Sequence, residues 1–214
     1  MGNQIKKCTI ISGAPDNDTD FLKEKIDKNS YIICADSGYK NCIKAGFTPN
    51  LIIGDFDSSK KPDIDCEIIT LDVEKAFTDS FHCVMEAVER DYNEIQIFCA
   101  IGSRMDHTYS NMLSLDYCQK HNVKCCIMNR KNRISLIKEK GIINKDYDNF
   151  SLFAYLSDCK GVKIKGAYYT AGFYDKDSLD IKQSDQFAQS NFVSDDYAEI
   201  TLDSGTLLLI ESND

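Results

Sequence analysis

Several features that would assign this chain to a membrane or secreted class are missing from its sequence. No apolar run is long enough for a transmembrane helix, and residues 1–7 lack the hydrophobic stretch of a signal peptide. Ten cysteines are present, but no Cys-x-x-Cys pair occurs, so a zinc site or a thioredoxin-type dithiol has little support. Cys8, Cys34, Cys99, Cys125 and Cys126 lie in apolar, strand-like runs, where a free thiol packs as a small hydrophobic group. We therefore expect a cytoplasmic protein with reduced cysteines.

Common nucleotide-binding motifs are also absent. The chain has neither a Walker A glycine-lysine loop nor a Gly-x-Gly-x-x-Gly segment after its first strand, which disfavours P-loop kinases and Rossmann dehydrogenases. Its formal net charge of −9 argues against nucleic acid or an anionic membrane surface as the main partner. A polyanionic substrate must therefore be received through a metal ion or a local group of Lys and Arg side chains.

The size and the hydrophobic pattern predict an α/β protein. With 214 residues, 43% hydrophobic and 28% charged, the chain suits one large domain or two small ones. Strand-like and helix-like segments alternate in the first half. The expected strands are 8–11, 31–35, 51–53, 68–71, 95–101 and 123–128, and the expected helices are 20–26, 39–45, a segment after Thr78, and 108–119. This alternation predicts a doubly wound, mostly parallel sheet.

The pattern changes after about residue 129. Short strand-like runs broken by Gly, Asp and Asn follow at 134–137, 150–156, 162–165, 198–202 and 207–210. No convincing helix lies among them, and the polar stretch 175–189 is interpreted as a loop. We therefore predict a small C-terminal antiparallel β-sandwich domain at 130–214 after an α/β catalytic domain at 1–129.

Aspartates follow two of the expected parallel strands. Asp36 comes after the strand at 31–35, and Asp55 and Asp57 come after the strand at 51–53. The carboxyl ends of parallel strands form the ligand crevice of an open sheet, and clustered carboxylate oxygens suit Mg²⁺. The alternative for Asp36 alone is a simple turn residue. The Asp-x-Asp pair indicates phosphate chemistry without naming an enzyme.

Two further clusters extend this candidate site. Thr78-Asp79 opens a helix, where Asp79 either caps the helix or binds a ligand. The segment Gly102-Ser103-Arg104-Met105-Asp106-His107 follows the strand at 95–101, with Asn111 one helical turn further on. The planar guanidinium of Arg104 matches phosphate oxygens, although a solvated loop residue is the simpler alternative.

Together these motifs resemble the thiamine pyrophosphokinase family, in order and spacing, over nearly the whole chain. The matching segments are Ala35-Asp36-Ser37-Gly38, Pro49-Asn50-Leu51-Ile52-Ile53-Gly54-Asp55-Phe56-Asp57-Ser58, Thr78-Asp79, Gly102 to His107 with Asn111, Lys165-Gly166-Ala167-Tyr168-Tyr169 and Ser190-Asn191. The resemblance implies an α/β domain, a β-sandwich domain and a homodimer whose active sites are shared between subunits.

The resemblance also implies roles for individual residues. Asp36, Asp55, Asp57 and Asp79 are expected to hold Mg²⁺ and the triphosphate, and Asp55, Asp57, Asp79 and Arg104 to be catalytic. Nucleotide binding is expected at Asp36, Ser37, Arg104, Asp106, His107 and Asn111. Thiamine binding is expected at Tyr169, Ser190 and Asn191, with Tyr169 stacking on the pyrimidine; an ordinary strand aromatic is the alternative for Tyr169. The sequence departs from the family pattern at Ala76, Ser103 and Phe192.

The expected activity is transfer of diphosphate from ATP to thiamine, which gives thiamine diphosphate and AMP. Either Asp79 or Asp57 could accept the hydroxyl proton. One alternative is a metal-dependent phosphohydrolase that uses the Asp-x-Asp pair, although the first strand ends without a nucleophilic Asp. The other is a thiamine- or nucleotide-binding module without catalysis, an alternative that Ala76 keeps open.

Overall fold

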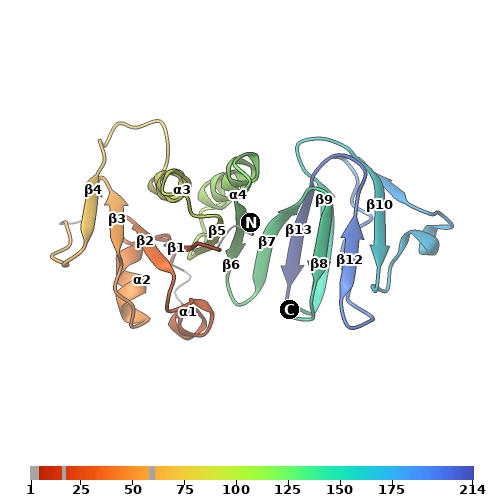
Figure 1. Cartoon of the computed structure of the whole chain (residues 1–214), viewed down its shortest axis with the longest axis horizontal. Helices are drawn as coiled ribbons and strands as arrows, with labels where there is room; N and C mark the ends of the chain where they lie inside the picture. Colours follow the sequence, from red (N-terminus) through yellow and green to blue (C-terminus); the bar gives the residue numbers. More distant parts are fainter. Residues whose placement is uncertain (1–4, 16–17, 58–60) are drawn as a thin grey trace. The chain divides into compact units, whose positions relative to one another are not determined.

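The computed structural model describes residues 5–15, 18–57 and 61–214 (Figure 1). Ser58, the last residue of the family-like segment that begins at Pro49, lies outside the described residues. The chain separates into two compact units between Arg130 and Lys131, and each unit is described by itself. No helix among the described residues is long and apolar enough to cross a membrane.

A parallel sheet forms the centre of the first unit. Its strands are β1 (Lys7–Ile11), β2 (Tyr31–Ala35), β3 (Leu51–Gly54), β4 (Glu67–Thr70), β5 (Glu94–Phe98) and β6 (Lys124–Met128), in the order β4-β3-β2-β1-β5-β6. All neighbouring pairs in this order are parallel. The chain moves outward from β1 to β4 and then returns to the other side of β1 with β5. The topological switch point therefore lies between β1 and β5.

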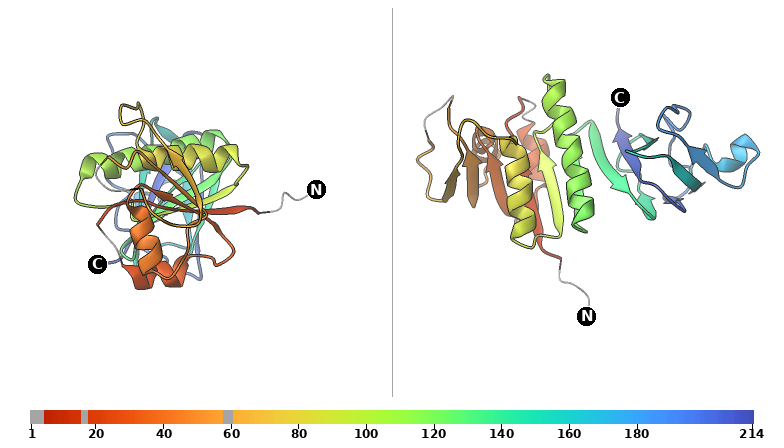
Figure 2. Two further views of the ribbon diagram at one scale, coloured as in Figure 1. Left: turned by 90° about the vertical axis from the view of Figure 1, so that its left-hand side faces the viewer. Right: turned by 90° about the horizontal axis from the view of Figure 1, so that it is seen from above.

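Helices cover both faces of this sheet, as expected for a doubly wound fold. They are α1 (Thr19–Lys25), α2 (Gly38–Lys44), α3 (Asp79–Glu89) and α4 (Met105–Lys120). Figures 1 and 2 show α1 and α2 on one face and α3 and α4 on the other. Because both faces are covered, the inner strands are almost continuously apolar, and Ile10, Ile33 and Ile52 are fully buried.

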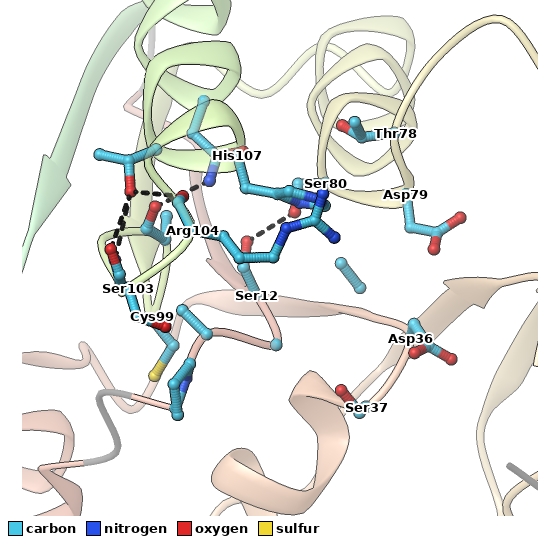
Figure 3. A pocket seen from close by; sticks show the side chains of 18 of the residues that line it. Ser12, Asp36, Ser37, Thr78, Asp79, Ser80, Cys99, Ser103, Arg104 and His107 are labelled. Atoms are coloured by element: carbon cyan, nitrogen blue, oxygen red, sulfur yellow. Dashed lines mark hydrogen bonds between the residues drawn. The ribbon is translucent and has the colours of Figure 1, made fainter. Parts of the chain in front are cut away.

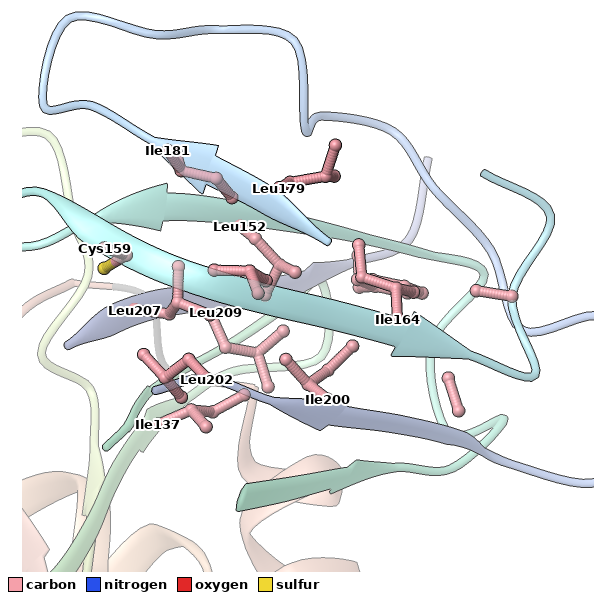
Figure 4. Close-up of a cluster of buried hydrophobic side chains, with 14 of the residues drawn as sticks. Ile137, Leu152, Cys159, Ile164, Leu179, Ile181, Ile200, Leu202, Leu207 and Leu209 are labelled. Carbon is pink, nitrogen blue, oxygen red and sulfur yellow. The ribbon is translucent and has the colours of Figure 1, made fainter. Parts of the chain in front are cut away.

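Two antiparallel sheets form the second unit. One has the order β7-β13-β9, with β7 at Asn132–Ile137, β9 at Asn149–Ala154 and β13 at Leu207–Ser212. The other has the order β11-β10-β12-β8, with β8 at Lys140–Ile143, β10 at Cys159–Lys165, β11 at Leu179–Ile181 and β12 at Ala198–Thr201. One core joins them, since Leu152 and Leu209 of the first sheet cluster with Ile164 and Ile200 of the second (Figure 4). The predicted fold class is confirmed.

Some predicted element boundaries were wrong. Residues 175–189 were interpreted as a loop but contain β11, which pairs with β10. Leu179 and Ile181 are buried on either side of exposed Asp180, so the two-residue period of a strand is present but very short. The strand predicted at 95–101 ends at Phe98, because Cys99 adopts a left-handed conformation (φ 53°) that turns the chain. A short 3₁₀ helix occupies Ala171–Tyr174.

Candidate active site

A pocket of about 380 Å³ lies at the carboxyl ends of the parallel strands in the first unit (Figure 3). Ser12 and Gly13 line it just after β1, and Cys99 and Ala100 line it just after β5. These are the two strands on either side of the topological switch point, where ligands bind in open α/β sheets. The pocket therefore lies where the fold places a ligand site.

The chain turns sharply where three strands reach this edge. Asp36 follows β2 with φ 41°, Phe56 lies two residues after β3 with φ 53°, and Cys99 follows β5 with φ 53°. Residues other than glycine rarely adopt this left-handed region, and such backbone strain gathers at functional sites. Gly54 allows the close approach of two of these turns, because a Cβ atom there would lie 3.0 Å from the Asp36 Cα.

The structure brings two predicted carboxylates, Asp55 and Asp79, together around Lys75. Lys75 Nζ donates a hydrogen bond to Asp55 Oδ2 and lies 3.0 Å from Asp79 Oδ1. The three side chains are 14%, 12% and 21% exposed, respectively. Asp36 lines the same pocket as Lys75 and Asp79. Asp57 is exposed, and its backbone N–H donates to Asp55 Oδ1 at 3.1 Å.

These contacts change the acidity of the cluster in different directions. The hydrogen bond from Lys75 lowers the pKa of Asp55, with help from the Asp57 N–H. Burial raises the pKa of Asp79; Lys75 opposes that shift, while nearby Asp55 and Asp36 add to it. Burial alone would lower the pKa of Lys75, but its contacts with the carboxylates of Asp55 and Asp79 outweigh burial and raise it.

The donor atoms of this cluster fit a hard divalent cation. Asp36 Oδ1 and Asp79 Oδ1 are buried and accept no hydrogen bond, although the latter lies within ion-pair distance of Lys75. Buried oxygens without such partners suit Mg²⁺, which prefers carboxylate ligands. In the described part of the chain, no three His, Cys, Asp or Glu side chains are already grouped as a metal site. The Lys75 ammonium group lies among the oxygens instead.

The loop before α4 contributes the basic side of the pocket. In the view of Figure 3, Arg104 and His107 lie above the pocket, and Asp36 and Ser37 lie below it. The exposed Arg104 guanidinium binds Asp106 in a forked ion pair, with Nη2 2.6 Å from Oδ2. This contact lowers the pKa of Asp106. Asp106 itself does not line the pocket.

Asn111 lies in the pocket wall, where it has a structural contact. Its side chain is buried, and Nδ2 donates to the Ala100 carbonyl oxygen at 2.8 Å. Thr108 accepts a second bond at this turn, from the Gly102 N–H at 3.2 Å. Asn111 and Thr108 therefore fix the turn between β5 and α4, and nucleotide contact by Asn111 stays a prediction.

Sequence reasoning missed several pocket residues. Ser12 follows β1 and Ser80 lies in α3, and their hydroxyl groups are hydrogen-bonded to each other at 2.9 Å. Lys75 was not among the predicted site residues, although it lines the pocket. The ion pair between Lys75 and Asp79 joins the segment before α3 to the first residue of that helix, and no helical spacing in the sequence indicates it.

The second unit carries the predicted thiamine residues on an exposed aromatic surface. Tyr168 stacks on Phe192, with ring centroids 4.8 Å apart, and Tyr169 contacts Phe173 at 4.9 Å. Asn191 is only 4% exposed, and its amide bonds to the Tyr169 backbone. Ser190 is exposed and left-handed (φ 53°). Tyr169, Ser190 and Asn191 thus lie close together within this unit.

The sequence matches known proteins of one family. A family model described as the catalytic domain of thiamin pyrophosphokinase matches residues 22–127. The thiamine pyrophosphokinase of Bacillus subtilis strain 168 is 30% identical over 138 residues, which are 62% of this chain and 64% of that protein. The matched segment therefore covers slightly less than two-thirds of that curated relative.

The fold matches solved structures over almost the whole chain. Thiamine pyrophosphokinase from Bacillus subtilis superposes with a TM-score of 0.88 at 24% identity, covering 98% of this chain and 100% of that one. The enzyme from Geobacillus thermodenitrificans gives 0.82 at 22% identity, covering 97% and 98%. The Candida albicans protein gives 0.73 at 17% identity, covering 97% and 89%. The family model, the curated relative and the shared fold agree: this chain belongs to the thiamine pyrophosphokinase family.

Proposed function

We propose that this protein is a thiamine pyrophosphokinase, which transfers the β,γ-diphosphate of ATP to the hydroxyethyl oxygen of thiamine and releases AMP. The observation that carries the proposal is the carboxylate cluster of a chain from this family: Asp36 and Asp79 line the switch-point pocket, and Lys75, which also lines it, joins Asp79 to Asp55. A pocket that combines these acids with Arg104 suits a metal-bound polyphosphate.

Asp36, Asp55, Asp57 and Asp79 are the residues that would hold Mg²⁺. The support is their oxygen-only chemistry and the two buried oxygens that accept no hydrogen bond. When bound, the ion supplies positive charge that offsets the charge of the phosphates. Ala76, which replaces an acid of the family pattern, is exposed. The absence of an acid at position 76 therefore does not remove Asp36, Asp55 or Asp79 from the cluster.

The protein's own contribution is orientation and charge stabilisation. Arg104 can exchange its exposed contact with Asp106 for phosphate oxygens, because its planar fork suits both partners. The thiamine hydroxyl then attacks the β-phosphorus in line with the leaving AMP oxygen. Asp79 is better located than Asp57 to accept the hydroxyl proton, since Asp79 lines the pocket and Asp57 is exposed outside the lining.

Thiamine is proposed to bind through Tyr169 and Ser190, positioned by Asn191, from the second subunit of a homodimer. No Phe or Tyr is among the described residues that line the pocket of the first unit. A flat aromatic substrate therefore needs its stacking partner from elsewhere, and the aromatic surface around Tyr169 provides one. Two-fold pairing is the commonest way to build a site from two copies.

The two alternative functions have no comparable support. A phosphohydrolase with a nucleophilic Asp would need that residue at the end of the first strand, where Ile11, Ser12 and Gly13 stand. A module without catalysis was suggested only by Ala76, which is exposed.

Product analysis tests the proposal. Purified protein mixed with thiamine, ATP and Mg²⁺ should form thiamine diphosphate and AMP in equal amounts, measured by mass spectrometry. An Asp79→Asn variant should form neither product, while its circular dichroism spectrum matches the parent protein. Formation of ADP with thiamine monophosphate would contradict the proposal.

A further inference from the structure

Lys75 bridges two carboxylates that come from different elements of the fold. Asp55 follows β3, and Asp79 is the first residue of α3. Lys75 Nζ contacts both, and all three side chains are mostly shielded from solvent. Lys75 also lines the pocket, so its ammonium group lies beside the proposed phosphate site.

Lys75 is surrounded by negatively charged side chains that repel one another. Asp36, Asp55 and Asp79 gather where burial weakens screening by water, so they repel one another. Arg104, the other strongly basic side chain of the pocket lining, is paired with Asp106. Among the described residues, the ion pairs of Asp55 and Asp79 are both with Lys75. Lys75 therefore supplies the positive charge that holds these acids together.

We infer that Lys75 is a tethered counter-ion that competes with a divalent cation for Asp55 and Asp79 and, once displaced, becomes a ligand of the substrate phosphates. The ammonium group and a divalent cation would use the same carboxylate oxygens. The flexible four-carbon stem of lysine lets Nζ move from one set of oxygens to another. This inference rests on the proposed function, because the phosphates belong to the proposed substrate.

The inference predicts that metal and nucleotide favour each other's binding. A metal ion that binds alone must separate Lys75 from two carboxylates, which weakens its affinity. A polyphosphate offers new oxygens to the displaced ammonium group. The cost of separating Lys75 from the carboxylates is therefore smaller when metal and nucleotide bind together. Such coupling is reciprocal by thermodynamic necessity. Loss of the ammonium group should therefore strengthen metal binding and weaken nucleotide binding.

Metal affinity without nucleotide is the first test. Binding of Mn²⁺ to the full chain is measured by electron paramagnetic resonance for the parent protein, Lys75→Met and Lys120→Met. We expect Lys75→Met to bind Mn²⁺ about tenfold more tightly, because the metal ion no longer has to break the contacts of the Lys75 ammonium group with the two carboxylates. Lys120→Met is the matched control, because Lys120 pairs with Asp116 on α4 and does not line the pocket. Its Mn²⁺ affinity should equal that of the parent protein.

Nucleotide affinity gives the opposite expectation. At saturating Mg²⁺, α,β-methylene-ATP should bind Lys75→Met about tenfold more weakly than the parent protein. A variant that is merely misfolded would lose affinity for both ligands. Unchanged or weaker Mn²⁺ binding by a folded Lys75→Met protein would overturn the inference.

A measurement on the parent protein covers the case in which Lys75→Met fails to fold. The full chain is labelled with ¹³C at the lysine ε-carbons and titrated with Mg²⁺. One resonance, assigned by its absence in Lys75→Gln or Lys75→Arg, should shift as Mg²⁺ binds. No shift of any lysine signal at saturation would reject the inference. None of these measurements depends on turnover. If the product assay fails but Lys75→Met binds Mn²⁺ more tightly than the parent protein, only the proposed function is rejected.

Discussion

The side-chain amide of Asn191 forms hydrogen bonds with both the backbone N–H and the backbone carbonyl of Tyr169. Asn191 Nδ2 donates to the Tyr169 carbonyl oxygen at 2.7 Å, and Oδ1 accepts from the Tyr169 N–H at 2.9 Å. Oδ1 also accepts from the Phe192 N–H at 3.0 Å. Both the oxygen and the nitrogen of this side chain hold the segment that presents Tyr169, so we expect Asn191 to act on thiamine binding by positioning Tyr169.

Replacement of Asn191 should therefore affect thiamine binding through Tyr169. Asn191→Asp keeps the acceptor oxygen but places a second oxygen against the Tyr169 carbonyl, so we expect a loss of about 2 kcal/mol in the free energy of unfolding. Urea denaturation measures this loss. Steady-state kinetics should show a raised KM for thiamine and an unchanged KM for ATP. Equal increases of both KM values would count against a local role.

Asp36→Asn should separate activity from stability. Asp36 adopts φ 41°, which Asn tolerates well, and its buried Oδ1 accepts no hydrogen bond. Removing one of three repelling charges should leave the melting temperature equal or higher. Loss of a proposed metal and phosphate ligand should lower kcat/KM by at least about a hundredfold. A variant that loses stability along with activity would contradict this assignment.

The start of α1 should contribute acid-sensitive stability. Asp18 accepts a hydrogen bond from the Phe21 N–H at 2.9 Å and pairs with Arg130, and these contacts lower the pKa of Asp18 to about 2. Its pKa in the unfolded chain is about 3.9. The stabilisation is therefore complete above pH 4 and is lost as pH falls toward 2.

An Asp18→Asn variant isolates this charge, because Asn can still cap the helix. The difference in unfolding free energy between the parent protein and Asp18→Asn should be about 1 kcal/mol or less at pH 6, given the exposure of the pair. It should shrink between pH 4 and pH 2 in urea denaturation. A difference that is constant over this interval would refute the ion pair as its source.

The proposed homodimer can be tested by complementation. Equal amounts of Asp79→Ala and Tyr169→Ala chains should exchange into dimers of which about half are mixed. If subunits share sites, each mixed dimer contains one intact site, so activity should return to about a quarter of the parent value. Native mass spectrometry verifies subunit exchange. Inactive mixed dimers would mean that each chain builds its own site.

The sequence was sufficient to predict the parallel strands and the acids that follow them. Ile32-Ile33 and Ile52-Ile53 are apolar because helices cover both faces of the sheet, and this burial leaves a clear pattern. Asp36 and the Gly54-Asp55 pair are residue types that favour turns, so the turns after these strands can also be predicted from the residues next to them in the sequence. Strands and candidate metal ligands whose signal lies in residues adjacent in the sequence could therefore be predicted without a structure.

Features that depend on strand order could not be found in this way. Ile10 lies opposite Ile97 because β1 pairs with β5, a contact between distant segments that no local pattern encodes. The hydrogen bond between Ser12 and Ser80 depends on that order. Likewise, the contact between Lys75 and Asp55 requires the segment after β4 to return toward β3. The strand β11 was missed because only Leu179 and Ile181 record its period.

Transfer of a diphosphate in one step is the central claim, and the fate of the β-phosphorus tests it most directly. The protein is incubated with thiamine, Mg²⁺ and ATP labelled only at the β-phosphorus, and the products are separated. Transfer of the β,γ-diphosphate predicts that all transferred label appears in thiamine diphosphate and none in AMP. Label retained in ADP, with unlabelled phosphate on thiamine, would show γ-phosphoryl transfer and contradict the account.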